Sequence, residues 1–156
     1  MSLLGLIIAI VSLDLWSKWA IKSSLRLYQS KPIIQDFFHL TYVTNDGMAF
    51  GINFPLGIYV FSTISVVFTL VLLWYLWTIK DQDFIIRAGI GLIIAGAVGN
   101  LIDRLFLGKV VDFLDFMIGD LHWYVFNFAD SYVTVGMCIM LYDSLVLEKK
   151  RELQID

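Results

Sequence analysis

Long apolar stretches separated by shorter polar segments dominate this chain. Four of them are long enough to cross a membrane, over residues 3–21, 56–79, 84–107 and 128–147. A helix rises about 1.5 Å per residue, so about 20 residues span a hydrocarbon layer of roughly 30 Å. The pattern predicts an all-α polytopic membrane protein with four transmembrane helices, organised as a single domain over residues 1–156.

The connectors between these stretches differ in character. Residues 37–44 are rich in Phe, Tyr, Thr and Val and alternate partly, which favours a strand. The sequence Asn45-Asp46-Gly47 that follows is a strong turn signal. We therefore expect a small extramembrane β-hairpin or sheet between the first two spans. We assign no regular element to the connector over 108–127.

Composition narrows the class of protein. Of 156 residues, 59% are hydrophobic and 16% charged, and the mean hydropathy is +0.79, which is too apolar for an ordinary soluble domain. The net charge of −3 argues against a nucleic-acid partner. His39 and His122 are isolated, so we expect neither a metal nor a cofactor. We expect the protein to be a monomer.

Two aspartates lie beside apolar segments, where charge is expensive. Asp112 follows the third span and Asp130 lies at the start of the fourth. A charged side chain at mid-bilayer costs roughly 2.5–3.5 kcal/mol, so such residues usually mark function or a wet cavity. Two carboxylates at one membrane face can share a proton and activate water. Asp112 and Asp130 are thus the candidate catalytic pair.

Other polar residues lie near the same membrane face. Each group has one structural and one functional interpretation. Asn100, Asp103 and Arg104 lie at one end of the third span, as a structural clamp or as a binding site in which Arg104 holds a phosphate or carboxylate. Asp14 and Lys18 have the i,i+4 spacing of an ion pair, which serves structure or contacts substrate directly.

Asn127 and Asp130 have the spacing of a helix N-cap and its third residue. Capping and catalysis are compatible there, because the helix dipole favours an ionised Asp130 and leaves a shared proton on Asp112. In the third span, Gly91, Ala95 and Gly99 recur every four residues. This stripe predicts close packing against another helix, and Asp103 continues it.

Five blocks together resemble the lipoprotein signal peptidases, or signal peptidase II, in their order along the chain. They are Asp14-Leu15-Trp16-Ser17-Lys18, Asn45-Asp46-Gly47-Met48-Ala49-Phe50, Gly99-Asn100-Leu101-Ile102-Asp103-Arg104, Val110-Val111-Asp112-Phe113 and Phe126-Asn127-Phe128-Ala129-Asp130. The resemblance implies an aspartic endopeptidase that removes the signal peptide from prolipoproteins before the diacylglyceryl-modified cysteine.

The resemblance also implies roles and a location. The catalytic pair would be Asp112 and Asp130. Substrate-binding or supporting roles would fall to Asp14, Lys18, Asn45, Asn100, Asp103, Arg104 and Asn127. The partners would be a diacylglyceryl-modified prolipoprotein and membrane lipid. The enzyme would lie in the bacterial cytoplasmic (inner) membrane, with cytoplasmic termini and the site toward the extracytoplasmic face.

Two other classes of function use some of the same residues. A small proton-coupled transporter would employ the acids as a relay, which requires carboxylates along the depth of the membrane. A non-catalytic assembly subunit would not require a close aspartate pair. The clustering of polar residues at one face favours the peptidase.

Overall fold

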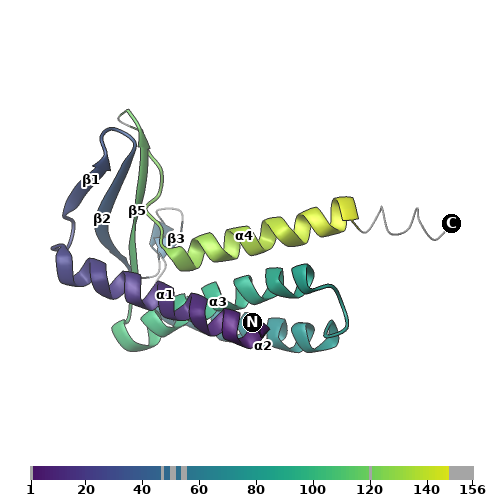
Figure 1. The fold of residues 1–156 in the computed structure, drawn as a ribbon. Coiled ribbons are helices and arrows are strands. Elements are labelled where there is room, and N and C mark those ends of the chain that lie inside the picture. Colours follow the sequence, from purple (N-terminus) through teal and green to yellow (C-terminus); the bar gives the residue numbers. More distant parts are fainter. Residues whose placement is uncertain (1, 47, 50–51, 54–55, 120, 148–156) are drawn as a thin grey trace.

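The fold is described from a computed structural model, which defines residues 2–46, 48–49, 52–53, 56–119 and 121–147 (Figure 1). The helices are α1 (Leu3–Ser24), α2 (Gly57–Thr78), α3 (Phe84–Leu107) and α4 (Phe128–Tyr142), which continues as a π-helical turn over Asp143–Leu147. Within these described residues, four helices are long and apolar enough to cross a membrane. The predicted spans are confirmed, and the first is three residues longer than expected.

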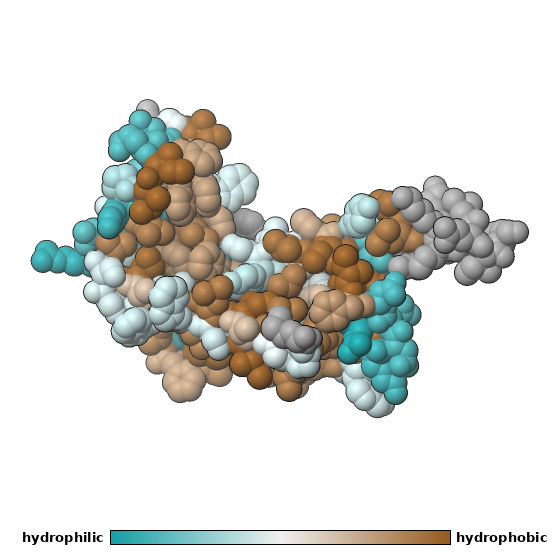
Figure 2. Space-filling model, viewed as in Figure 1, coloured by the Kyte–Doolittle hydropathy of each residue, from teal (hydrophilic) through white to brown (hydrophobic). Residues whose placement is uncertain are grey.

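The helices expose apolar side chains on the outside of the bundle. Leu4 on α1, Phe106 on α3 and Leu141 on α4 are each more than half exposed. Apolar surface covers the middle of the helices, and hydrophilic residues gather toward their ends (Figure 2). This is the distribution that a bilayer requires, since its hydrocarbon layer solvates the apolar outer faces.

Small residues bring the helices close together. A Cβ at Gly136 of α4 would lie 2.6 Å from the carbonyl oxygen of Gly89 on α3, so the two backbones can come this close only because position 136 is glycine. The predicted stripe also packs as expected, since Gly91 faces Leu3 and Ile7 of α1. The buried cluster between the helices consists of Leu72, Ile90, Ile93 and Ile94.

A four-stranded antiparallel sheet stands at the end of the bundle where α1 ends and α4 begins (Figure 1). Its order is β1-β2-β5-β6, with bounds Ser30–Ile34, Phe38–Asn45, Val110–Ile118 and Leu121–His122. A separate pair joins β3 (Met48–Ala49) to β4 (Ile52–Asn53). The expected sheet is confirmed, and β2 lies within one residue of its prediction.

Strand β5 is a regular element in the connector 108–127, to which the sequence pattern assigned none. Residues 110–115 are all buried, so both faces of the strand are covered and the apolar–polar alternation of a half-exposed strand is absent. The chain enters β5 through Gly108, which ends α3 with φ 68°, a left-handed conformation that favours glycine.

An aromatic joint fixes the sheet on the bundle. Ile21 near the end of α1 is buried with Phe113 and Leu114 of β5. Phe113 meets Phe128 of α4 edge-on, with ring centroids 5.5 Å apart. Because β5 is held against both α1 and α4, the first residues of β5 lie beside the start of α4.

Candidate active site

Asp112 lies near the beginning of β5 and is 6% exposed. It is paired with Val43 across the sheet, and its Oδ1 accepts a hydrogen bond of 2.7 Å from Nδ2 of Asn127. The carboxylate is therefore bound to the residue at which α4 begins, 15 positions later in the chain.

Asp130 lies in the first turn of α4 and forms the predicted capping box with Asn127. The Asn127 side chain accepts from the backbone N–H of Asp130 at 3.0 Å, and Oδ2 of Asp130 accepts from the backbone N–H of Asn127 at 3.1 Å. Asn127 is fully buried. Its cap thus fixes the orientation of the Asp130 side chain.

Asn100 of α3 completes a bridge between the two aspartates. Its Nδ2 donates to Oδ1 of Asp130 at 2.8 Å, and its Oδ1 accepts from Nδ2 of Asn127 at 3.0 Å. Asn127 therefore bonds to Asp112 through its side chain and to Asp130 through the cap, while Asn100 bonds to Asp130 and to Asn127. The structure brings together two carboxylates from β5 and α4, as the sequence led us to expect.

Lys18 is buried behind this bridge. Its Nζ lies 2.8 Å from Asp14 and 3.2 Å from Asp103, and it donates to Oδ1 of Asn100 at 2.9 Å. The predicted Asp14–Lys18 ion pair is confirmed, as is the orientation of Asp103 toward a neighbouring helix. Lys18 is 2% exposed, so in this structure its link to the site runs through Asn100.

The two aspartates bound to Lys18 also hold the backbone beside the candidate pair. Asp103 accepts from the N–H of Val111 at 3.1 Å, and Asp14 accepts from the N–H of Ala129 at 2.9 Å. Val111 immediately precedes Asp112, and Ala129 immediately precedes Asp130. Each supporting carboxylate therefore fixes the peptide unit before one candidate catalytic residue.

Arg104 and Asn45 lie at the border of this network. Arg104 is half-buried and donates from Nη1 to Oγ of Ser65 on α2 at 3.1 Å, while Asp130 and Asp112 lie within electrostatic range of its guanidinium. Its side chain is thus directed to α2, whereas that of Asn100 joins the buried network. Asn45 is half-buried at the end of β2, opposite Val110.

The electrostatic environment gives Asp112 a higher pKa than that of an ordinary carboxylic acid. Burial, with a smaller contribution from the charge of Asp130, raises the pKa of Asp112 to about 7, although the hydrogen bond from Asn127 opposes the rise. Near neutral pH, a large fraction of Asp112 is therefore protonated and able to donate a hydrogen bond.

Several contributors to the site carried no recognisable signal in the sequence. Ser65 is one of several hydroxyl residues in the span of α2, and backbone N–H groups such as those of Val111 and Ala129 exist at every non-proline position. Gly99 was predicted as a packing residue, and a Cβ there would lie 2.5 Å from Oδ2 of Asp14. Its lack of a side chain is what lets Asp14 reach between α3 and α4.

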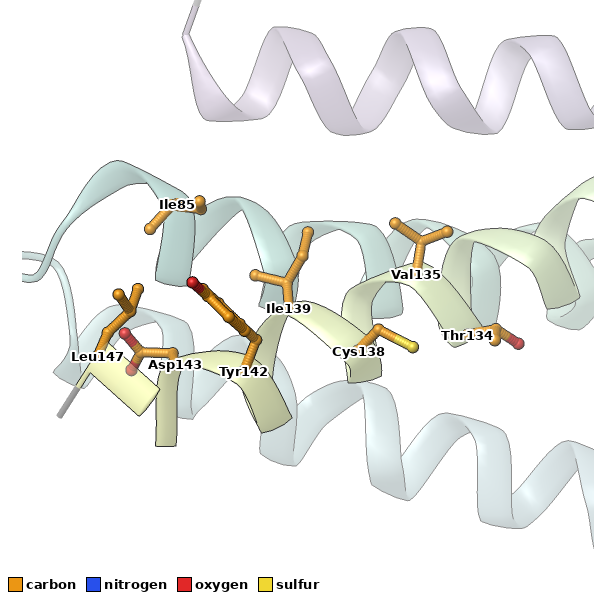
Figure 3. Close-up of a pocket in the computed structure, with 8 residues that line it drawn as sticks. All are labelled: Ile85, Thr134, Val135, Cys138, Ile139, Tyr142, Asp143 and Leu147. Atoms are coloured by element: carbon orange, nitrogen blue, oxygen red, sulfur yellow. The ribbon is translucent and has the colours of Figure 1, made fainter. Parts of the chain in front are cut away.

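Two apolar cavities lie apart from the aspartates. A groove of about 290 Å³ runs along the outer side of α4 (Figure 3). Another, of about 420 Å³, lies on the sheet and includes Trp123 and Tyr124. The aromatic part of the connector between β5 and α4 therefore lines this second groove. Neither cavity has Asp112 or Asp130 in its wall.

Comparison with known proteins gives a consistent result. The family model described as signal peptidase (SPase) II matches residues 6–146. This chain belongs to that family. It is 40% identical over 137 residues to a lipoprotein signal peptidase of Desulforapulum autotrophicum, covering 85% of each chain. A lipoprotein signal peptidase of Halothermothrix orenii is 43% identical over 135 residues, which are 86% of this chain and 89% of that one.

Solved structures agree with the family assignment. A bacterial membrane enzyme determined by the in meso method at 1.9 Å resolution has a TM-score of 0.81 and 31% identity, covering 92% of both chains. The signal peptidase II resemblance of the five sequence blocks is therefore confirmed, together with the helical membrane fold bearing a small sheet.

A proton relay across the membrane is not favoured by the helix interior. The buried residues of α3 between Ile86 and Gly99 are all isoleucine, alanine or glycine. No carboxylate of α3 lies along this stretch, so the acid and amide side chains of α3, Asp103 and Asn100, lie at the sheet end. This distribution disfavours the transporter alternative.

Proposed function

We propose that this protein is an aspartic endopeptidase of the membrane that removes the signal peptide from prolipoproteins, cutting before the diacylglyceryl-modified cysteine. The observation that carries the proposal is the hydrogen-bonded pair of amides between the two carboxylates: Asn127 donates to Asp112 and to Asn100, and Asn100 donates to Asp130. Family membership supports the proteolytic activity, and the relatives named above supply the class of substrate.

The chemistry follows from two carboxylic groups in different protonation states. Asp130 accepts hydrogen bonds on both oxygens at a helix N-terminus, where negative charge is favoured. Burial raises the pKa of Asp112 to about 7, which favours its acid form. Asp130 takes a proton from water while the water oxygen attacks the scissile carbonyl carbon, and Asp112 gives its proton to the carbonyl oxygen.

The resulting tetrahedral diol then collapses. Asp130 returns its proton to the leaving amide nitrogen, the carbon–nitrogen bond breaks, and Asp112 recovers a proton from a hydroxyl of the diol. Both carboxyl groups end as they began, and no covalent intermediate forms. Since the two groups are coupled, the pH–rate profile belongs to the pair.

The supporting residues position the catalytic carboxyl groups and the substrate. Asp14, Lys18 and Asp103 fix the backbone before each catalytic aspartate. Asn127 and Asn100 orient the carboxyl groups. Arg104 and Asn45, at the border of the network, would contact the substrate backbone and the polar linkage of its lipid.

We place the protein in the bacterial cytoplasmic membrane, with cytoplasmic termini and the site at the extracytoplasmic face. The sheet stands at one end of the bundle (Figure 1), and the polar cluster lies at the same end because Asp112 belongs to β5. A signal peptide would emerge at this face after translocation. Single-cysteine labelling from outside intact cells would test this orientation at Lys31 on β1 and at Lys80 in the α2–α3 turn. Labelling at position 31 alone is expected, and labelling at position 80 alone would reverse it.

The decisive test uses matched precursors in detergent micelles. A prolipoprotein with a diacylglyceryl-modified cysteine should be cut to the mature size on a gel, and mass spectrometry should place the cut before that cysteine. The same precursor without lipid should be cut at least about tenfold more slowly, because acyl chains contribute about 0.8 kcal/mol per CH₂ to membrane partitioning.

The outcomes separate the parts of the proposal. Equal rates on the two precursors would refute lipid recognition but retain an endopeptidase. No cleavage of the lipidated precursor by a folded enzyme would refute the proposed activity altogether.

A further inference from the structure

A second buried carboxylate on β5 belongs to no part of the mechanism. Asp115 is 3% exposed and lies three residues after Asp112. Its Oδ2 accepts a hydrogen bond of 2.6 Å from Oγ1 of Thr41 on β2, and its Oδ1 lies 3.0 Å from Nδ1 of His122 on β6. Asp115 therefore connects the strands on both sides of β5.

The chain between the two catalytic aspartates is a hairpin. Its outgoing arm is β5, and its return arm runs from β6 to Asn127. The arms are joined by backbone hydrogen bonds between Leu114 and Phe126, and again from the N–H of Trp123 to the carbonyl of Phe116. Asp112 lies near the beginning of the outgoing arm, and Asp130 lies just beyond the end of the return arm.

Pairing lapses between these two points. Between the two sets of hydrogen bonds, the outgoing arm has one residue, Asp115, and the return arm has two, Tyr124 and Val125. Within the described part of the chain, Tyr124 and Val125 form no backbone–backbone hydrogen bond. The Asp115–His122 contact crosses the hairpin beside this gap. It runs from the β5 residue at the gap to a β6 residue that is itself paired with Met117, and so adds a polar tie at the edge of the gap.

We propose that Asp115 and His122 are positioning residues for the cleavage reaction: their contact fixes the return arm of the hairpin, and thereby the placement of Asn127 and Asp130 relative to Asp112. A hydrogen bond to a buried carboxylate is directional and stronger than a neutral one. It sets the spacing of the arms more sharply than apolar packing does. The inference rests on the proposed function, because the reaction is what the spacing serves.

The test measures kcat and KM of purified variants on the lipidated precursor. Asp115→Asn keeps the shape of the side chain but turns an amide N–H₂ toward one of its two donors. We expect kcat to fall on the order of 10- to 100-fold, as for a small misplacement of reacting groups, while KM changes little. His122→Leu should give a similar loss, and His122→Gln, which keeps an N–H donor, should recover part of it.

Two comparisons distinguish positioning from general sheet stability. Thr41→Val removes the other hydrogen bond of Asp115, toward β2 and outside the hairpin, so its kcat should stay closer to that of the wild type even if the melting temperature falls equally. The double variant Asp115→Asn/His122→Leu should lose no more kcat than the worse single variant, since both changes break one contact.

A wild-type kcat in folded Asp115→Asn would overturn the inference and leave the proposed function standing. The inference would also be overturned if the Thr41 and His122 variants both lost kcat in the same proportion to their fall in melting temperature. Failure of the wild-type enzyme to cut the lipidated precursor would instead refute the proposed function.

Discussion

In the middle of the bundle, α3 meets α4 through Gly89 and Gly136, and the buried cluster there is leucine and isoleucine. At the sheet end, the same helix α3 contributes Asn100 and Asp103, which are held by a buried lysine. One helix thus packs by shape over most of its length and by hydrogen bonds and charge at its last turns.

The two regions differ in how they respond to change. Apolar packing is not directional, and volume-conserving substitutions there usually cost less than about 1.5 kcal/mol. A buried polar network is directional, and removing one member leaves its partners without compensation. The polar network at the sheet end therefore fixes the positions of individual atoms, whereas apolar packing in the middle of the bundle does not need to.

The largest contrast should come from the proposed catalytic pair. Asp112→Asn and Asp130→Asn should each lower cleavage of the lipidated precursor by at least about 100-fold, because an amide neither takes nor gives the required proton. Gel-shift assays at matched folded concentration measure this. As a control, the apolar substitution Ile93→Val should retain near-normal turnover. If either asparagine variant keeps near-normal turnover, that aspartate is a cap or a clamp.

Removing the buried cation should be the largest effect on stability. Lys18→Met leaves Asp14 and Asp103 without their counter-charge, which typically costs about 3–5 kcal/mol. Thermal unfolding in detergent should show a large fall in melting temperature. The same substitution at Lys80, which is exposed in the α2–α3 turn, should have little effect. Similar melting temperatures for the two variants would show that the Lys18 network does not stabilise the fold.

Two glycines on one face of α3 sharpen the comparison. Both face α1, but a Cβ at Gly99 would lie 2.5 Å from the carboxylate of Asp14, and one at Gly91 would lie 3.1 Å from the flexible end of Leu3. Gly99→Ala should lower both activity and melting temperature. Gly91→Ala should be neutral or stabilising by up to about 1 kcal/mol, because alanine favours a helix. Equal effects would contradict the distinction between the two regions.

The last prediction concerns the pH dependence of stability. The pKa of Asp112 rises from 3.8 to about 7 on folding, so the native state binds more protons than the unfolded state between these values. Stability should therefore fall as pH rises through this window. Asp112→Asn removes the ionisation and should melt higher than the wild type at pH 8, with the two converging near pH 4. A wild type that melts higher than Asp112→Asn at pH 8 would refute this assignment.

Much of the architecture followed from the sequence alone. The four spans and strand β2 were recognisable because apolar length and strand composition are local properties of the chain. The Asp14–Lys18 pair and the Asn127–Asp130 cap were also local, since i,i+4 spacing and capping geometry arise within one helix. Strand β5 was missed because it is buried on both faces and interrupted by Asp112 and Asp115.

The tertiary structure decided which of these local features come into contact. Nothing in the sequence shows that Asp103 binds the N–H of Val111, that Asp14 binds that of Ala129, or that Arg104 turns to Ser65. Backbone donors have no sequence signature, and contacts across 115 positions depend on how closely the helices pack. The sequence determined which residues could do chemistry at one membrane face. Packing at Gly99 and the aromatic joint of the sheet decided that they converge on one pair of amides, because only a folded bundle brings α1, α3, β5 and α4 within hydrogen-bonding distance.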